Sequence, residues 1–102
     1  NVADNLTGSG SSSQANSFAI AADVNFFTTL ADANAGARLP ADFEVNGTVE
    51  IYNGNQSTAM KIYPHVGGNI NNAATDANIV LSATKGSIFR RINATRWAAV
   101  YV

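Results

Sequence analysis

His65 is the only histidine of the chain, and it lies in a turn between Pro64 and Val66. Histidine titrates near neutral pH, but a catalytic base also needs a group that orients it and a nucleophile or substrate within reach. Serine and aspartate occur elsewhere, yet no nucleophile elbow or other catalytic motif places them around His65. We therefore interpret His65 as a loop histidine without a catalytic role.

The acidic residues are spread singly along the chain, and Asp42 and Glu44 are the closest pair. A glycosidase needs two carboxylates at a set separation across a cleft, and a calcium loop needs several closely spaced oxygen ligands. Cysteine is absent, and the glycines lack the lysine or helix start of a phosphate-binding loop. The sequence thus predicts no enzyme, no metal, no cofactor and no small-molecule substrate.

Arginines and aromatic residues gather in the last two runs of the chain. Arginine suits protein interfaces because its planar guanidinium binds carboxylates with two hydrogen bonds and loses water more readily than lysine. Neighbouring residues on a strand point to opposite faces, so at least one of Arg90 and Arg91 leaves the core side. Solvated ends of a terminal hairpin are the alternative interpretation. The predicted partner contacts, including two apolar residues of the N-terminal segment, are Val2, Leu6, Arg90, Arg91, Arg96, Trp97 and Tyr101.

The last run is apolar on both sides, because Trp97 and Tyr101 alternate with Ala98 and Val100. Such a strand is covered on both faces, either within a sandwich or between subunits. A sugar-stacking platform that combines these aromatic residues with other tyrosines, such as Tyr52, is the alternative. We favour the core or interface role.

Short runs rich in β-branched and aromatic residues follow one another at roughly ten-residue spacing, separated by turn residues. This pattern predicts an all-β domain over 17–102, either an antiparallel β-sandwich or a partly open barrel of about seven short strands. The alanine-rich segment 28–38 is predicted to be a loop with at most one helical turn, because Gly36 interrupts it. The predicted strands lie at 17–22, 25–30, 48–53, 58–63, 78–82, 87–92 and 96–102.

An Asn-Gly dipeptide connects the runs 48–53 and 58–63. Asn-Gly between two alternating apolar runs is the strongest short-range signal for a β-hairpin. We therefore predict that these two runs pair, with their alternate apolar residues on one face. Glu50 would then lie opposite Lys61 on the outward face.

Residues 1–16 are predicted to form a flexible N-terminal arm. Most of the segment 7–17 is glycine, serine and other small polar residues, which bury too little apolar surface to offset the entropy of ordering. Two interpretations stay open, a passive tail and an arm that orders on a neighbouring subunit.

The composition bounds the class of protein. With 102 residues the chain is long enough for one domain, and only 13% of its residues are charged, against roughly 25% in soluble proteins. The net charge of −1 gives no strong attraction to nucleic acid or to an anionic membrane. No apolar run approaches the ~20 residues of a membrane span. We expect a soluble protein that functions as part of a larger assembly.

Two segments carry a resemblance to a known class, KIYPHVGGNIN at 61–71 and INATRW at 92–97. Together with the turn pattern over 17–102, they resemble a small all-β virion module of tailed phages, in particular the capsid decoration (cement) proteins. The adjacent pair Arg90-Arg91 departs from that pattern, which has one charged residue there, and leaves the register of this strand open.

The resemblance implies a structural role without enzymatic activity. Such proteins sit as homotrimers on the outer capsid surface of the virion, bind the major capsid protein and clamp neighbouring subunits, after synthesis in the cytoplasm of the bacterial host. A tail, fibre or baseplate β-domain that recognises a host surface or glycan is the alternative, favoured by the Asn/Thr-rich composition. A hydrolase would rest only on His65 and the scattered acids.

Overall fold

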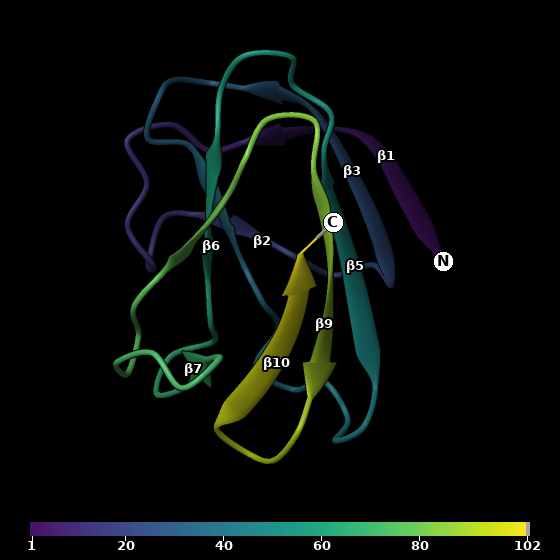
Figure 1. Ribbon diagram of the computed structural model, residues 1–102, viewed down its shortest axis with the longest axis vertical. Helices are drawn as coiled ribbons and strands as arrows, with labels where there is room; N and C mark the ends of the chain where they lie inside the picture. Colours follow the sequence, from purple (N-terminus) through teal and green to yellow (C-terminus); the bar gives the residue numbers. More distant parts are fainter. Residues whose placement is uncertain (102) are drawn as a thin grey trace.

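The computed structural model describes residues 1–101, and this part of the chain forms two β-sheets without a helix (Figure 1). The large sheet has the strand order β1-β3-β5-β9-β10-β7, and the small sheet has the order β2-β4-β6-β8. The strands are β1 (Val2–Gly8), β2 (Phe18–Ala19), β3 (Val24–Leu30), β4 (Gly36–Arg38), β5 (Thr48–Asn53), β6 (Met60–Tyr63), β7 (Asn69–Ile70), β8 (Ile79–Leu81), β9 (Gly86–Arg91) and β10 (Arg96–Tyr101).

The first six strands alternate between the two sheets, and within each sheet they run parallel. In the large sheet Val2 pairs with Val24, and Val24 in turn pairs with Glu50. The chain therefore winds like a short solenoid, in which each winding adds one strand to each sheet. Parallel neighbours require such a crossover, because a tight turn can join only antiparallel strands.

Apart from an isolated antiparallel bridge between Ser9 and Gly36, antiparallel pairing involves strands of the second part of the chain. There β8 pairs with β6, β9 pairs with β5, and β10 pairs with β9 in the terminal hairpin. The all-β prediction and the pairing of the last two runs are confirmed. The predicted antiparallel arrangement is wrong for the first six strands, whose stacking is solenoid-like and not a clear antiparallel sandwich or barrel.

The hairpin predicted around Asn53-Gly54 is not formed, because β5 and β6 belong to different sheets. The Asn53 side chain is buried, and its Nδ2 donates hydrogen bonds to the carbonyl oxygens of Thr58 and Leu81. Asn53 thereby holds an arch that carries the chain from one sheet to the other. Glu50 and Lys61 are consequently not cross-strand partners.

The core lies between the two sheets and consists of alternate residues of their strands. In β5 the burial pattern alternates strictly, and Val49 and Ile51 are fully buried. Met60 and Ile62 of β6 are also fully buried, so the predicted inward residues are right although their strands do not pair. Complete burial of one such aliphatic or aromatic side chain contributes about 1.5–3 kcal/mol. The core residues of largest volume are Trp97, Phe27, Phe89, Leu39, Ile51, Met60, Ile62, Ile70 and Leu81.

The predicted flexible arm is wrong for the N-terminal segment. Residues 2–8 form β1, which pairs in parallel with β3, and Leu6 packs against the core. The serine-rich residues that follow are held by polar contacts: the Ser11 amide donates to Asp32, and the Ser12 amide donates to the carbonyl of Asn34. Sheet pairing and backbone hydrogen bonds order this segment without the apolar surface that its composition lacks.

Strand positions were predicted better than strand partners. The runs at 25–30, 48–53, 58–63, 78–82 and 87–92 coincide with β3, β5, β6, β8 and β9 within one or two residues. The run 17–22 shrinks to β2, and Val102 of the last run lies outside the described residues. The segment 28–38 contains the end of β3, a turn and β4, so it has no helical turn. The strands β1, β4 and β7 had no counterpart in the prediction.

Candidate functional site: the outer face of the large sheet

The outer face of the large sheet is built from every second residue of its strands. In β5 and β9 the inward residues Val49, Ile51 and Phe89 are fully buried, whereas Glu50 and Ile88 between them point outward. This alternation follows from the pleat of a β-strand. We use the name apolar face for the outward side chains Val2, Val24, Phe26, Glu50, Tyr52, Ile88, Arg90 and Val100.

Five of these side chains form one row across the sheet, because direct backbone partners run in the order Val2, Val24, Glu50, Ile88 and Val100. Four of the five are apolar. Val2 is 70% exposed, Val100 is 65% exposed and Ile88 is 42% exposed. Exposed apolar patches that are larger than usual on a soluble protein mark contact sites.

Two aromatic rings extend the apolar face next to this row. Phe26 and Tyr52 are direct cross-strand partners, and their rings stack with centroids 6.3 Å apart. Glycines make room for both rings: a Cβ atom at Gly86 would overlap the Tyr52 ring, and one at Gly54 would overlap the Phe26 ring. The rings therefore lie close against the sheet and do not project far from the apolar face.

Shallow hollows border these rings on two sides. One of about 450 Å³ is lined by Val2, Asp4, Val24, Phe26 and Tyr52. The other, of about 260 Å³, is bordered by the same two rings and by polar side chains of the neighbouring turns, which include Gln56 and Lys85.

Glu50 is the acidic group at the centre of the apolar face. Its backbone partners on either side are Val24 and Ile88, and its side chain is half-buried. The Tyr52 hydroxyl donates a hydrogen bond of 2.5 Å to Glu50 Oε1. This hydrogen bond, together with partial burial and the carboxylate charge, raises the pKa of Tyr52 above its ordinary value.

Arg90 is the basic group on the same face, one outward position beyond Ile88. It is exposed, and its Nη1 donates to the backbone carbonyl and to Oδ1 of Asn46, at 2.9 and 3.0 Å. Within residues 1–101, the ion pair that the structure contains joins the N-terminal ammonium to Asp23. Glu50 and Arg90 are therefore not paired with each other inside the chain.

The small sheet differs because the chain covers part of its outer side, although Val80 on this side is 57% exposed. The Tyr63 hydroxyl donates to the carbonyl of Ser12 at 3.0 Å, and Arg38 Nη1 donates to the carbonyl of Gln14 at 2.6 Å. Gln14 Nε2 also donates to the carbonyl of Pro64. Residues 12–14 of the predicted free arm thus lie on the small sheet, and the apolar face of the large sheet has no comparable cover within residues 1–101.

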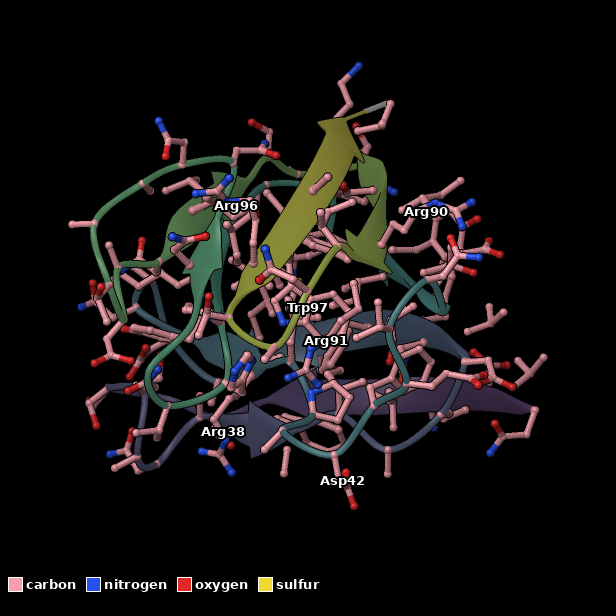
Figure 2. All side chains as sticks on the ribbon, turned by 90° about the horizontal axis from the view of Figure 1, so that it is seen from below. Arg38, Asp42, Arg90, Arg91, Arg96 and Trp97 are labelled. Carbon is pink, nitrogen blue, oxygen red and sulfur yellow. The ribbon has the colours of Figure 1, made fainter. Side chains whose placement is uncertain are left out.

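Arg91 and Trp97, both predicted to contact a partner, are inside the molecule. Arg91 is 6% exposed, and its guanidinium donates to four carbonyl oxygens and lies 5.4 Å from the centre of the Trp97 ring. Trp97 is fully buried. Figure 2 shows both side chains near the middle of the view, with Arg90 and Arg96 farther from the centre. Arg91 and Trp97 therefore position the chain and are not available to a partner. The four carbonyls belong to Ala41, Phe43, Asn93 and Ala94.

His65 is a buried member of this internal cluster. Its Nδ1 accepts a hydrogen bond from Trp97 Nε1 at 3.0 Å. Burial, followed by the positive charge of Arg91, lowers the pKa of His65, while a hydrogen bond to the Ala94 carbonyl and the charge of Asp76 oppose this. His65 therefore points into the molecule and fixes the position of the Trp97 indole through this hydrogen bond, which is a structural role.

The other predicted contact residues lie at different depths. Val2 belongs to the apolar face, Arg96 is exposed and Leu6 is half-buried against the core. The side chain of Tyr101 is outside the part of the chain that the structure describes. The sequence prediction missed Phe26 and Ile88. The adjacent phenylalanines at 26 and 27 were a usable signal, since one of two neighbours on a strand must point away from the core.

Within the described range, no three histidine, aspartate or glutamate side chains gather closely enough to hold a metal ion. The same residues include no helix that is long and apolar enough to span a membrane. Comparisons with protein-family models, with curated proteins and with solved structures found no match to this chain.

Proposed function

We propose that this chain is a non-enzymatic structural protein of a tailed-phage virion, which binds the outside of the capsid and stabilises the shell by bridging neighbouring capsid subunits. Its partner is the major capsid protein, and it acts at the outer capsid surface after synthesis in the bacterial cytoplasm. The resemblance of KIYPHVGGNIN and INATRW to decoration proteins supports this proposal.

The main evidence for a role in protein contact is that the outer faces of the two sheets are covered to different degrees. Ser12 and Gln14 of the serine-rich segment contact the small sheet and cover part of its outer side, where Val80 is exposed. On the large sheet Val2, Ile88 and Val100 are exposed in one row. Transfer of exposed apolar area out of water contributes about 25 cal/mol per Å². A chain with few charges and one exposed apolar face gains stability when another protein covers that face.

Cosedimentation tests this function. The protein is mixed with DNA-free shells of the major capsid protein encoded in the same genome, and in parallel with the unassembled subunits of that protein. We expect binding to shells only, and shells that resist heat and low ionic strength better when the protein is bound. Equal binding to free subunits, or no binding to shells, contradicts the proposal.

Recognition of host-surface glycans by a tail, fibre or baseplate domain is a second candidate function. The stacked rings of Phe26 and Tyr52 favour it, because they border a hollow of about 260 Å³ whose rim carries Gln56 and Lys85. Pockets that combine aromatic surface with a few polar groups are typical of small-ligand sites. Adsorption of the isolated protein to host cells or to a glycan array, lost in Phe26→Ala, would favour this function over capsid binding.

A further inference from the structure

We infer that the apolar face pairs with the same face of a second copy of this chain, through two reciprocal contacts between Glu50 and Arg90. The inference rests on the proposed function in one respect: linked copies that each contact one capsid subunit are a means of bridging. The pairing itself is a property of the protein alone and can be measured without capsid.

Glu50 limits what can cover the apolar face. Its carboxylate lies between Val24 and Ile88, and the Tyr52 hydroxyl is its hydrogen-bond donor within residues 1–101. An apolar cover would remove water from this carboxylate without giving it a cation, and a buried charge without a partner is strongly destabilising. The molecule that covers the face must therefore place a cationic donor over Glu50.

The same face carries such a donor. Arg90 pairs with Thr48, and Ile88 pairs with Glu50, so Glu50 and Arg90 are diagonal neighbours on adjacent antiparallel strands. Diagonal neighbours are about 7–8 Å apart. Arg90 uses Nη1 for its two hydrogen bonds to Asn46, and within residues 1–101 its Nε and Nη2 make none. These two nitrogens can form the two-hydrogen-bond contact that arginine makes with a carboxylate.

A two-fold axis makes the contact reciprocal. If the axis lies in the plane between two facing copies and crosses the line from Glu50 to Arg90 at its midpoint, at a right angle, each Glu50 meets the Arg90 of the other copy. The symmetry makes the two contacts equivalent, as in an isologous dimer, in which the same surface of each copy forms the interface. Ile88 and Thr48, the backbone partners of Glu50 and Arg90, then lie beside the axis, and the two Ile88 side chains exclude water from the centre of the pair.

The size of the face predicts a weak pair. Five strands spaced about 4.8 Å apart, with outward residues over a strand length of about 20 Å, give a face of roughly 400–500 Å². Two copies would bury at most about 800–1,000 Å², which is at the low end for specific interfaces. We therefore expect dimers that form at high concentration and dissociate on dilution.

The exposed edge of β1 is a poorer site for self-association. The pairing of β1 with β3 is irregular between Ala3 and Leu6, and Asn5 within it has a φ of 56°. A bulge of this kind twists the edge and disfavours the addition of another strand. The face of the large sheet, and not its edge, is thus the surface that fits a second copy.

Sedimentation equilibrium over a range of concentrations, at low salt, tests the pairing. The wild-type protein should show a monomer–dimer equilibrium, and each single variant Glu50→Arg and Arg90→Glu should weaken dimerisation about tenfold or more, because like charges then face each other. An equimolar mixture of the two variants should form dimers again, since every facing pair in the mixed dimer is of opposite charge. A role of either residue inside its own chain cannot produce this rescue by mixing.

Asp42→Arg is the matched control, because Asp42 is exposed and points away from the side of Arg90 in Figure 2. This variant should dimerise like the wild type. A wild-type protein that stays monomeric at high concentration, or a mixture that does not dimerise, overturns the inference. Trimers of unchanged mass in both single variants would overturn it too, and would favour the homotrimer that the resemblance implies.

Shell binding separates this inference from the proposed function. If the protein is monomeric and Glu50→Arg abolishes its binding to shells, the apolar face docks on the capsid itself and the pairing is wrong while the function stands. If the protein dimerises as expected but does not bind shells, the pairing stands and the function is wrong.

Discussion

Trp97 Nε1 donates a hydrogen bond of 3.0 Å to His65 Nδ1, deep between the sheet and the loop that follows β6. The bond requires a histidine that is neutral at Nδ1. Protonation at this nitrogen would remove the acceptor of the Trp97 indole and add a positive charge close to Arg91. The only histidine of the chain thus forms a hydrogen bond with the largest buried side chain.

The stability of the protein should fall as the pH decreases below the pKa of about 6.5 that histidine has in unfolded chains. Burial and Arg91 lower the pKa of His65 in the folded state, so between the two pKa values the unfolded state binds more protons. The free energy of unfolding then decreases with falling pH and levels off below the folded-state pKa. Urea unfolding at a series of pH values between 5 and 8 measures this slope.

His65→Gln provides the control for the pH dependence. The glutamine amide oxygen can still accept a hydrogen bond but does not titrate in this range. We expect a lower stability at pH 8 and a nearly flat profile between pH 5 and 7. A slope that persists in this variant would assign the pH dependence to other groups. The carboxyls Asp32 and Asp76, whose pKa values are lowered mainly by hydrogen bonds from Asn34 and Gln14, act only at more acidic pH.

Arg91→Gln should destabilise the protein by about 3 kcal/mol. The guanidinium of Arg91 holds carbonyl oxygens of two loops, at Ala41 and Phe43 on one side and at Asn93 and Ala94 on the other. Hydrogen bonds from a charged donor contribute about 1.5–3 kcal/mol each, and the exposed ends of these loops recover part of the loss through water. Denaturant unfolding measures the difference.

The neighbouring arginine is the matched control for this substitution. Arg90→Gln removes an exposed side chain that contacts Asn46, so its effect should stay within about 0.5 kcal/mol. Equal losses for the two substitutions would contradict the internal role of Arg91. The comparison should be made at low protein concentration, because Arg90 is also part of the proposed self-contact.

The sequence was sufficient for features that depend on local alternation. The pattern of Thr48–Asn53 specifies which side chains face the core. The last two runs are joined by a short polar turn, and strands joined by so short a turn can pair only as an antiparallel hairpin. The apolar character of both sides of the last run was also visible. Its inward member Trp97 is core, and its outward member Val100 belongs to the apolar face.

Features that depend on distant partners were not predictable in this way. Parallel pairing joins residues such as Val2 and Val24 that share no turn, so nothing local identifies β1 as a strand. Which of Arg90 and Arg91 points inward depends on carbonyl groups of Ala41 and Phe43, nearly fifty positions earlier. The Asn53-Gly54 dipeptide predicted a hairpin, but it forms an arch between the two sheets. The arch depends on buried acceptors of the Asn53 side chain, which the local sequence does not reveal.

Gly86→Ala should destabilise the protein by about 1–2 kcal/mol, because the new methyl group would overlap the Tyr52 ring. The ring must then move away from β9, and its hydroxyl loses the hydrogen bond to Glu50. A double-mutant cycle with Tyr52→Ala isolates this contact. In the Tyr52→Ala background the added methyl group should cost less than about 0.5 kcal/mol, whereas an undiminished cost would place the strain in the backbone.

Leu6→Ala should destabilise the protein by about 2 kcal/mol, although Leu6 lies in a segment whose composition is typical of a mobile arm. Leu6 packs against the core from β1, and its removal leaves a space beside the buried Phe27, its backbone partner on β3. Val2→Ala, on the same strand but 70% exposed, should change the stability by less than about 0.5 kcal/mol at low concentration. Thermal unfolding and amide hydrogen exchange of β3 measure both effects. If β1 were a free arm, the two substitutions would be equally harmless and β3 would exchange as an unprotected edge; the pairing of Val2 with Val24 predicts protection that Leu6→Ala weakens.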